Sequence, residues 1–355
     1  MFMLSVLPAR WRPLLLMYLL GLGVVAGPAY TMYVHYDFAH SLDSRDYLSI
    51  ARGEFRGQSI TRRYRVLVPA AAAAVAWPLE KVYARIWPQR AATDWPLRLG
   101  FYLVNTLLMA AVGVVLYATA RRYGAAPAAA ALAVVVVLSS RWAVYLAGLP
   151  LVDSLYLLVF ALAFYAVRAR SGAALLAVLG LGPLAKESFV LLVPWLLWWG
   201  RPALPGWRLP AALALGAGLA LAVRHWIDLQ AGAPFAASVS NAVSHVENLR
   251  YSLGRLLSVK GAGEIFSIFG FGWLALLAGG RGPANGRREW LARLDAPALS
   301  LLAVVVVHML LSGELARMGY LAAPVFAVVL ALIIEQRGWL GENTAEPAPT
   351  PNAEA

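Results

Sequence analysis

Two carboxylates in a short polar stretch are the residues best suited to acid–base chemistry. In the segment DSRDYLSIA, three- and four-residue spacing places Asp43, Asp46 and Tyr47 on one face of a predicted helix. A carboxylate in a cleft beside lipid has its pKa raised by desolvation, which suits a base that takes a proton from a hydroxyl or an amine. The competing interpretation is structural, with Asp43 capping the helix and Asp46 complementing the helix dipole. Either carboxylate is a candidate base.

Arginines form the second group of candidates. Arg62, Arg63 and Arg65 follow in the segment RRYR, and Arg317 stands much later, in GELARMGY. A guanidinium group binds phosphate through paired hydrogen bonds, so these side chains are predicted to bind an anion. Plainer interpretations stay open, because the loop arginines can reach for lipid headgroups and Arg317 can form an exposed pair of little energetic value with Glu314.

Further charged residues interrupt apolar sequence. Asp153 lies in GLPLVDSLYLLVF, and the adjacent Lys186 and Glu187 lie in LGLGPLAKESFVLLVP. Ionisable groups in apolar membrane segments are costly and are therefore functional candidates. Lys186 is predicted to bind a phosphate, and Glu187 to orient it or to bind a sugar. The alternatives are a helix-dipole role for Asp153 and a self-satisfying pair formed by Lys186 and Glu187.

The chain offers little for metal or nucleotide chemistry. It has no cysteine, and its five histidines show neither HxxxH nor HExxH spacing. The glycines at 180–182 lie in an apolar run rather than after a strand, so they are not a phosphate-binding loop. We therefore expect neither a metal cofactor nor an ATP-driven activity.

Composition predicts the elements that must position these residues. The chain has 355 residues, of which 61% are apolar and only 14% charged, with a mean hydropathy of +0.67. A soluble domain is about 25% charged, so we predict an all-α, polytopic transmembrane bundle; the apolar runs lack the alternation of a barrel. The net charge of +12 favours anionic headgroups or a lipid phosphate as partners, and not nucleic acid. About ten spans are predicted, near 13–34, 97–119, 126–147, 151–168, 173–185, 187–200, 209–228, 263–279, 295–312 and 318–335.

Short basic loops set the predicted orientation. Loops such as the one at Arg121 and Arg122 all fall on one side of this count, which the positive-inside rule makes cytoplasmic. Both termini are then cytoplasmic, in a bacterial-type inner membrane. Residues 1–341 are predicted to form one membrane domain, followed by a disordered tail at 342–355.

Two large loops are predicted on the outer side. The loop at 35–96 contains an apolar segment, 66–80, which we expect to lie in or dip into the outer leaflet, although a full span stays open. The loop at 229–262 contains an amphipathic helix, in which Val246, Leu249 and Leu253 recur at helical spacing, suited to a membrane surface. The many basic residues of the first loop favour a site for an anion presented at the outer leaflet.

Taken in order, these motifs resemble those of the GT-C superfamily of integral membrane glycosyltransferases, in particular the bacterial aminoarabinose transferases and protein mannosyltransferases. The residues that carry the resemblance are Asp43, Tyr47, Ile50, Ala51 and Arg52, then Leu179–Gly182, Leu184–Lys186 and Pro194, and finally Arg317 and Pro324. Glu187 departs from the pattern, because that family often has Gly there. That family usually has an acidic residue two positions after the first Asp. Here that position is not acidic, and Asp46 supplies the second carboxylate instead. No soluble C-terminal domain is expected, so acceptor contacts must come from the loops.

The resemblance implies a polyprenyl-phosphate-sugar donor, used on the outer face of the membrane. The reaction would be a single inverting displacement at the anomeric carbon, with Asp43 or Asp46 deprotonating a glycan, lipid or protein acceptor. Electrostatic stabilisation of the leaving phosphate would need no metal. The implied substrate-binding residues are Tyr47, Arg62, Arg63, Arg65, Asp153, Lys186, Glu187 and Arg317, and the donor tail would lie between the spans and segment 66–80.

Other functions stay open at this point. A lipid or lipid-linked-sugar flippase would use Asp153, Lys186 and Glu187 as a pathway, although transporters usually show inverted repeats and this chain shows none. A glycan polymerase or ligase also has many spans and basic outer loops. The transferase hypothesis requires Asp43, Lys186 and Arg317 to converge on one extracytoplasmic cavity that is open to the bilayer.

Overall fold

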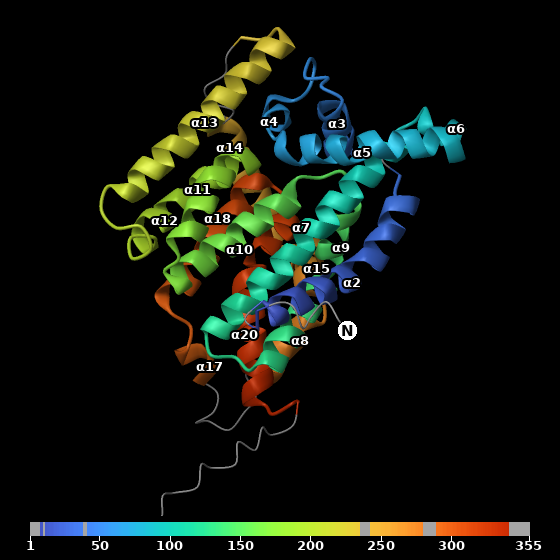
Figure 1. The fold of residues 1–355 in the computed structure, drawn as a ribbon. Coiled ribbons are helices and arrows are strands. Elements are labelled where there is room, and N and C mark those ends of the chain that lie inside the picture. The colour runs from blue at the N-terminus through green and yellow to red at the C-terminus, as the bar shows by residue number, and fades with distance from the viewer. Residues whose placement is uncertain (1–7, 10, 38–40, 235–241, 280–288, 341–355) are drawn as a thin grey trace, which may run out of the picture.

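The chain folds as a bundle of helices, seen in a computed structural model (Figure 1) that describes residues 8–9, 11–37, 41–234, 242–279 and 289–340. Within these ranges the secondary structure is helical and contains no strand. The predicted all-α class is therefore confirmed. The tail at 342–355, and part of the 229–262 loop, lie outside the described residues.

Several helices are long and apolar enough to cross a membrane. They are α2 (Arg12–His35), α7 (Trp95–Arg122), α13 (Arg208–Ala231) and the continuous segment Leu315–Gln336, which comprises α19 (Leu315–Gly319), η3 (Tyr320–Ala322) and α20 (Ala323–Gln336). Two bent pairs also pass the same test when each is taken as one unit. They are α8 (Pro127–Leu138) with α9 (Arg141–Gly148), bent by 64°, and α15 (Val259–Phe269) with α16 (Gly272–Gly279), bent by 88°. The protein is thus a membrane-embedded helical bundle.

The remaining predicted spans correspond to shorter helices. These are α10 (Asp153–Ala169), α11 (Gly172–Ala185), η2 (Glu187–Leu192) with α12 (Val193–Trp199), and α18 (Ala296–Ser312). By length and composition the described residues give 4 spans, or 6 with the bent pairs, against about ten predicted. Segment 66–80 belongs to α5 (Leu67–Ile86), which is not among the candidate spans of the described chain and ends in a charged stretch.

Helix α7 forms the centre of the packing. It contacts α2, α5 and α10, and its Gly100 lies so close to α5 that an added Cβ would stand 2.3 Å from the carbonyl oxygen of Ala72. Small residues allow such close approach between helices in membranes. The last helix, α20, is buried on nearly all sides. Together α7, α10 and α20 form a rigid core for the polar residues at one end.

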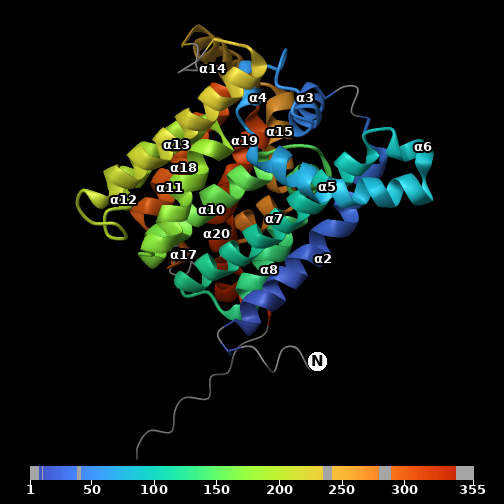
Figure 2. The same cartoon turned by 45° about the horizontal axis from the view of Figure 1, so that its top comes forward.

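The polar elements gather at that end. Figure 2 shows α3 (Leu42–Ala51), α4 (Ile60–Arg63) and α14 (Ala242–Leu256) together at the top of the molecule, whereas α2 begins and α20 ends at the bottom. Helices α5 and α6 (Pro88–Ala91) extend sideways from the same end (Figure 1). The remaining short helix, α17 (Glu289–Ala292), precedes α18.

Two breaks in the helices lie near this polar end. Lys186 is extended, with φ −163° and ψ 139°, and separates α11 from η2. Gly313 adopts φ +75° at the end of α18, a left-handed conformation that favours glycine, and the chain then turns into α19. Non-helical backbone at membrane depth is tolerated where it is buried in protein or lines a polar cavity. The two breaks therefore indicate that a polar site lies at this end of the bundle.

We expect one glycine in α13 to control the packing of that helix against α11. A Cβ added at Gly216 would lie 2.1 Å from the carbonyl oxygen of Leu179, whereas one added at Gly218 meets nothing within 4 Å. Gly216→Ala should therefore destabilise the protein by about 1–3 kcal/mol through overpacking. Gly218→Ala, the matched control, should be neutral or stabilising by up to about 1 kcal/mol. Thermal unfolding in detergent measures both, and equal effects would contradict the packing argument.

Candidate functional site

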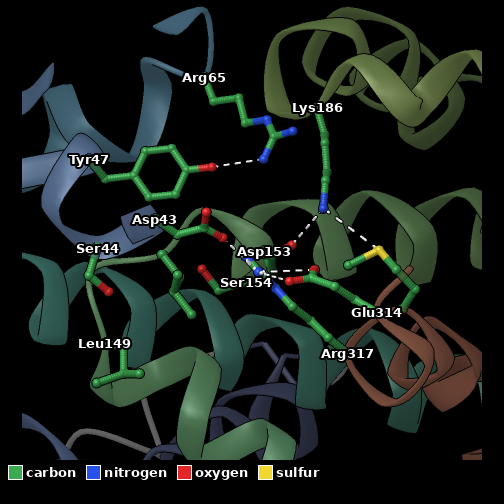
Figure 3. A network of polar contacts seen from close by, with 12 residues as sticks. Asp43, Ser44, Tyr47, Arg65, Leu149, Asp153, Ser154, Lys186, Glu314 and Arg317 are labelled. Carbon is green, nitrogen blue, oxygen red and sulfur yellow. Dashed lines mark hydrogen bonds and ion pairs between the residues drawn. The ribbon is translucent and has the colours of Figure 1, made fainter. Parts of the chain in front are cut away.

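A buried ion cluster lies at the centre of the polar end. The Asp153 carboxylate accepts a hydrogen bond from Lys186 Nζ at 2.9 Å through one oxygen and binds Arg317 Nη2 through the other (Figure 3). All three side chains are at least nine-tenths buried. A buried carboxylate between two cations is satisfied, whereas removing one partner of such a cluster typically costs about 3–5 kcal/mol. Asp153 therefore fixes Lys186 and Arg317 relative to each other.

The position of Asp153 follows from its neighbours. Asp153 is the first residue of α10, where the helix dipole favours negative charge. The segment before it is held by Asn105 of α7, whose Nδ2 donates to the carbonyl oxygens of Leu149 and Leu151 at 2.9 and 3.0 Å. Asn105 is fully buried, as a polar residue in the middle of an apolar helix. These bonds tie the start of α10 to the central helix of the bundle.

Arg317 connects this cluster to the first loop. Its Nη1 donates to Asp43 Oδ2 at 2.7 Å and to Glu314 at 3.1 Å. The buried Arg317 Nε has no hydrogen-bond partner among the described residues. The interpretation of Arg317 as one half of an exposed pair with Glu314 is therefore wrong, because the guanidinium is buried and serves three carboxylates.

The loop carboxylates of α3 meet Arg62. Arg62 Nε pairs with Asp43, and its Nη1 donates to Asp46 Oδ2 at 2.8 Å. The N-terminus of α3 is capped by Ser41, whose hydroxyl accepts from the backbone N–H of Ser44. Asp43 is therefore not the capping residue, and its carboxylate is directed to the arginines.

Arg65 makes the corresponding connection to the break at Lys186. Its Nε donates to Glu187 Oε2 at 2.9 Å, and its Nη1 donates to the hydroxyl oxygen of the buried Tyr47 at 2.8 Å. Lys186 and Glu187 thus have separate partners and do not satisfy each other. Residues 43, 153, 186 and 317 thus form one set of contacts and residues 47, 65 and 187 a second, and the peptide bond from Lys186 to Glu187 joins the two sets into one network.

A cavity of about 340 Å³ is bounded by this network. The predicted site residues that line it are Asp43, Arg62, Arg65, Lys186, Glu187 and Arg317. Asp46, Tyr47 and Asp153 do not line the cavity, but each binds a residue that does. Asp43, Lys186 and Arg317 thus converge on one cavity, whereas its extracytoplasmic side and its opening to the bilayer, which the transferase hypothesis also requires, stay predictions.

Arg63 does not lie at the cavity but at the contact between α4 and α13. Its Nη2 donates to Asp228 Oδ1 of α13 at 2.7 Å, and the neighbouring Tyr64 hydroxyl donates to the same carboxylate at 2.8 Å. Arg63 and Asp228 are both buried and neither lines the cavity. We predicted the same role, anion binding, for all three arginines of this segment, but successive residues of a short helix point in different directions. Arg63 anchors α4 to α13 and in this way places Arg62 and Arg65.

Several lining residues were missed by the sequence reasoning. His245 and Asn248 come from α14, His308 from α18, and Ser188 from η2. Asn105, beneath the site, was also missed. His308 and Asn105 stand alone in apolar runs, which is a usable signal for membrane segments. Nothing in the local sequence of α14 indicates which of its faces meets the cavity.

The electrostatics of Asp43 differ from the prediction. Burial alone would raise the pKa of Asp43, but the charges of Arg317 and Arg62 and the Arg317 hydrogen bond outweigh it, so the pKa is lowered. The prediction of a raised pKa is therefore wrong for this state of the site. For Arg62, burial would lower the pKa, but the Asp46 hydrogen bond and the Asp43 charge raise it. With both groups ionised, Asp43 is a strong hydrogen-bond acceptor.

Comparison with protein families, with curated proteins and with solved structures finds no match to this chain. Among the described residues, no group of three or more His, Cys, Asp or Glu side chains is arranged to hold a metal ion. The chemistry of the site must therefore be argued from its own geometry.

The lowered pKa of Asp43 predicts a pH-dependent contribution to stability. A group with a depressed pKa in the folded state stabilises fully above its unfolded pKa, about 3.9 for Asp, and loses this contribution as pH falls through the folded value. Wild type should therefore unfold at a higher temperature than Asp43→Asn near neutral pH, and the gap should close below about pH 4. A gap that is constant or widens on acidification would contradict the assignment.

The Arg63–Asp228 pair predicts a large stability effect remote from the cavity. Asp228→Asn leaves a buried guanidinium without a counter-charge and should cost about 3 kcal/mol. The matched control is Asp94→Asn, which breaks an exposed pair with Arg52 and should cost less than about 1 kcal/mol. Arg63→Met combined with Asp228→Asn should recover much of the loss, because the unpaired charge is gone. Similar unfolding temperatures for the two single variants would contradict the anchoring role.

Proposed function

We propose that this protein is an inverting glycosyltransferase of the GT-C type, which transfers a sugar from a polyprenyl-phosphate donor to an acceptor at the outer face of the inner membrane. The observation that carries this proposal is the set of cations around Asp43 in one cavity of a membrane-embedded bundle: Arg62, Arg65, Lys186 and Arg317. A carboxylate that can take the acceptor proton, and several cations that can stabilise a departing phosphate, are what this reaction requires.

The cations are arranged for a phosphate group. Arg62, Arg65 and Arg317 each offer several N–H donors, and the buried Nε of Arg317 is unsatisfied among the described residues. Lys186 is held by Asp153 beneath the cavity and still lines it. Guanidinium groups match phosphate oxygens in pairs. A phosphate in the cavity would share these donors with Asp43 and Glu314.

The donor, the acceptor and the residues of the cavity account for every bond and proton of the proposed reaction. The acceptor oxygen or nitrogen attacks the anomeric carbon, a new bond forms there with inversion, and the bond from that carbon to the phosphate oxygen breaks. The acceptor proton passes to Asp43, and polyprenyl phosphate leaves with the electron pair. Arg62, Arg65, Lys186 and Arg317 stabilise the negative charge that develops on the phosphate.

Donor binding would also raise the pKa of Asp43. The lowered pKa of Asp43 depends on the charges of Arg317 and Arg62 and on the Arg317 hydrogen bond. A phosphate that draws these guanidinium groups to itself weakens their hold on Asp43, so the basicity of the carboxylate rises when the donor is in place. The enzyme would therefore gain a proton acceptor only in the complex that needs one.

An apolar groove next to the cavity suits the donor tail. It has a volume of about 220 Å³ and lies between η2–α12 and α13, where Phe189, Val193 and Leu213 contribute to its walls. Glu187 lines both this groove and the cavity, so the two lie side by side. This path differs from the one expected along α5. A prenyl chain in the groove would leave its phosphate beside Lys186 and Arg65.

Substitution of the two loop carboxylates tests the proposal. Asp43 lines the cavity, whereas Asp46 lies outside it and binds only the far side of Arg62. Asp43→Asn should lower sugar transfer by about 10²- to 10⁴-fold, the usual worth of a general base, whereas Asp46→Asn should retain most activity. The measurement is mass spectrometry of envelope glycans and glycoproteins in a deletion strain complemented with each variant.

The controls separate folding from chemistry. Both variants must be inserted in the membrane at wild-type levels, and the deletion strain must lack one sugar that wild type restores. Full complementation by Asp43→Asn would overturn the role of Asp43. A deletion strain with unchanged glycans would overturn the transferase proposal, and movement of a labelled lipid by purified protein in liposomes would then support a flippase.

A further inference from the structure

Helix α14 is oriented with its polar side inward. Asn248 Nδ2 donates to the carbonyl oxygen of Leu311 at 3.1 Å, and the Ser252 hydroxyl donates to that of Met309 at 3.4 Å. Ser252 is fully buried. These carbonyls belong to the last turn of α18, where the helix leaves backbone acceptors without intrahelical partners. Hydrogen bonds to a helix end therefore fix which face of α14 meets the protein.

Several apolar residues of α14 and of its C-terminal end point away from the protein, although Leu249 is half-buried. Val246, Leu253 and Leu256 recur at helical spacing and continue into Leu257. Their exposed fractions are 66%, 47%, 36% and 92%. A helix that met only water on this side would normally bury such a stripe against the bundle and expose Asn248 and Ser252 instead. The reversed arrangement indicates apolar surroundings.

Exposed apolar residues continue along the chain on both sides of the stripe. Val259, which opens α15, is 92% exposed, and Phe271, beside α16, is 79% exposed. Helix α13, which precedes this region in the chain, exposes Trp226 and Leu229 and is long and apolar enough to span a membrane. The side of α14 next to the stripe carries the exposed Glu247, and Arg250 stands within the stripe, where its long side chain can extend the guanidinium group to the headgroups. Apolar stripes with charged flanks are typical of helices that lie in a membrane interface.

We propose that α14 lies in the lipid–water interface and forms the wall between the cavity and the bilayer. Its inner face presents His245 and Asn248 to the cavity, and its outer stripe of Val246, Leu253, Leu256 and Leu257 contacts the acyl chains. The occupant of the outer face is thus the phospholipid of the membrane that contains the spans. This assignment does not depend on the reaction that the cavity performs.

The lack of cysteine in the chain makes a direct test possible. Single variants Leu253→Cys and Leu257→Cys report on the stripe, and Glu247→Cys on the same helix is the matched control. Each full-length variant is labelled with a nitroxide and reconstituted in phosphatidylethanolamine–phosphatidylglycerol nanodiscs. Power saturation then compares collisions with oxygen, which concentrates in lipid, and with a water-soluble nickel chelate.

The proposal expects oxygen to dominate at positions 253 and 257, and the nickel chelate to dominate at 247. Dominance of the nickel chelate at all three positions would overturn it, because the stripe would then face water. Protection of 253 and 257 from both reagents, with spin–spin broadening that grows with protein density, would also overturn it and identify a second copy of the chain as the occupant. If one stripe variant fails to insert, Val246→Cys takes its place.

Discussion

The Asp153 carboxylate, shared between Lys186 and Arg317, is the interaction on which the polar end of the molecule depends. Lys186 stands in the break after α11, and Arg317 lies in α19, the short helix that follows the break after α18. Desolvating such charges is expensive, and the cost is met only because every member of the cluster has a partner of opposite sign. The remainder of the network is built outward from this point, through Arg317 to α3 and through Glu187 to Arg65.

The architecture around the cluster shows how a membrane bundle maintains a polar site. Asn105 ties the start of α10 to α7, and His308 Nε2 lies 3.1 Å from the carbonyl oxygen of Ser188, beside the break at Lys186. These buried side chains satisfy backbone groups that the broken helices leave open. The polar cavity is therefore supported by single polar residues in otherwise apolar helices, and the apolar packing of α7 and α20 keeps them in place.

Much of this organisation could be predicted from the sequence. Charges in apolar runs are few and expensive, so Asp153, Lys186 and Glu187 stood out, and the bundle follows from composition. What could not be predicted was the pairing, because ion pairs such as Arg63 with Asp228 join residues far apart in the chain. The direction of each arginine side chain in the RRYR segment could not be predicted either. The pKa of Asp43 was predicted with the wrong sign, because local sequence reveals burial but not the arrangement of opposing charges.

The adjacent residues Lys186 and Glu187 have one further consequence. Because the chain is extended at Lys186, the two side chains take different directions, one toward Asp153 at the start of α10 and the other toward Arg65 in the segment between α4 and α5. A single peptide unit thus joins the buried ion cluster to that segment. A displacement of Arg65 and a displacement of Asp153 would therefore act on neighbouring residues of the same break.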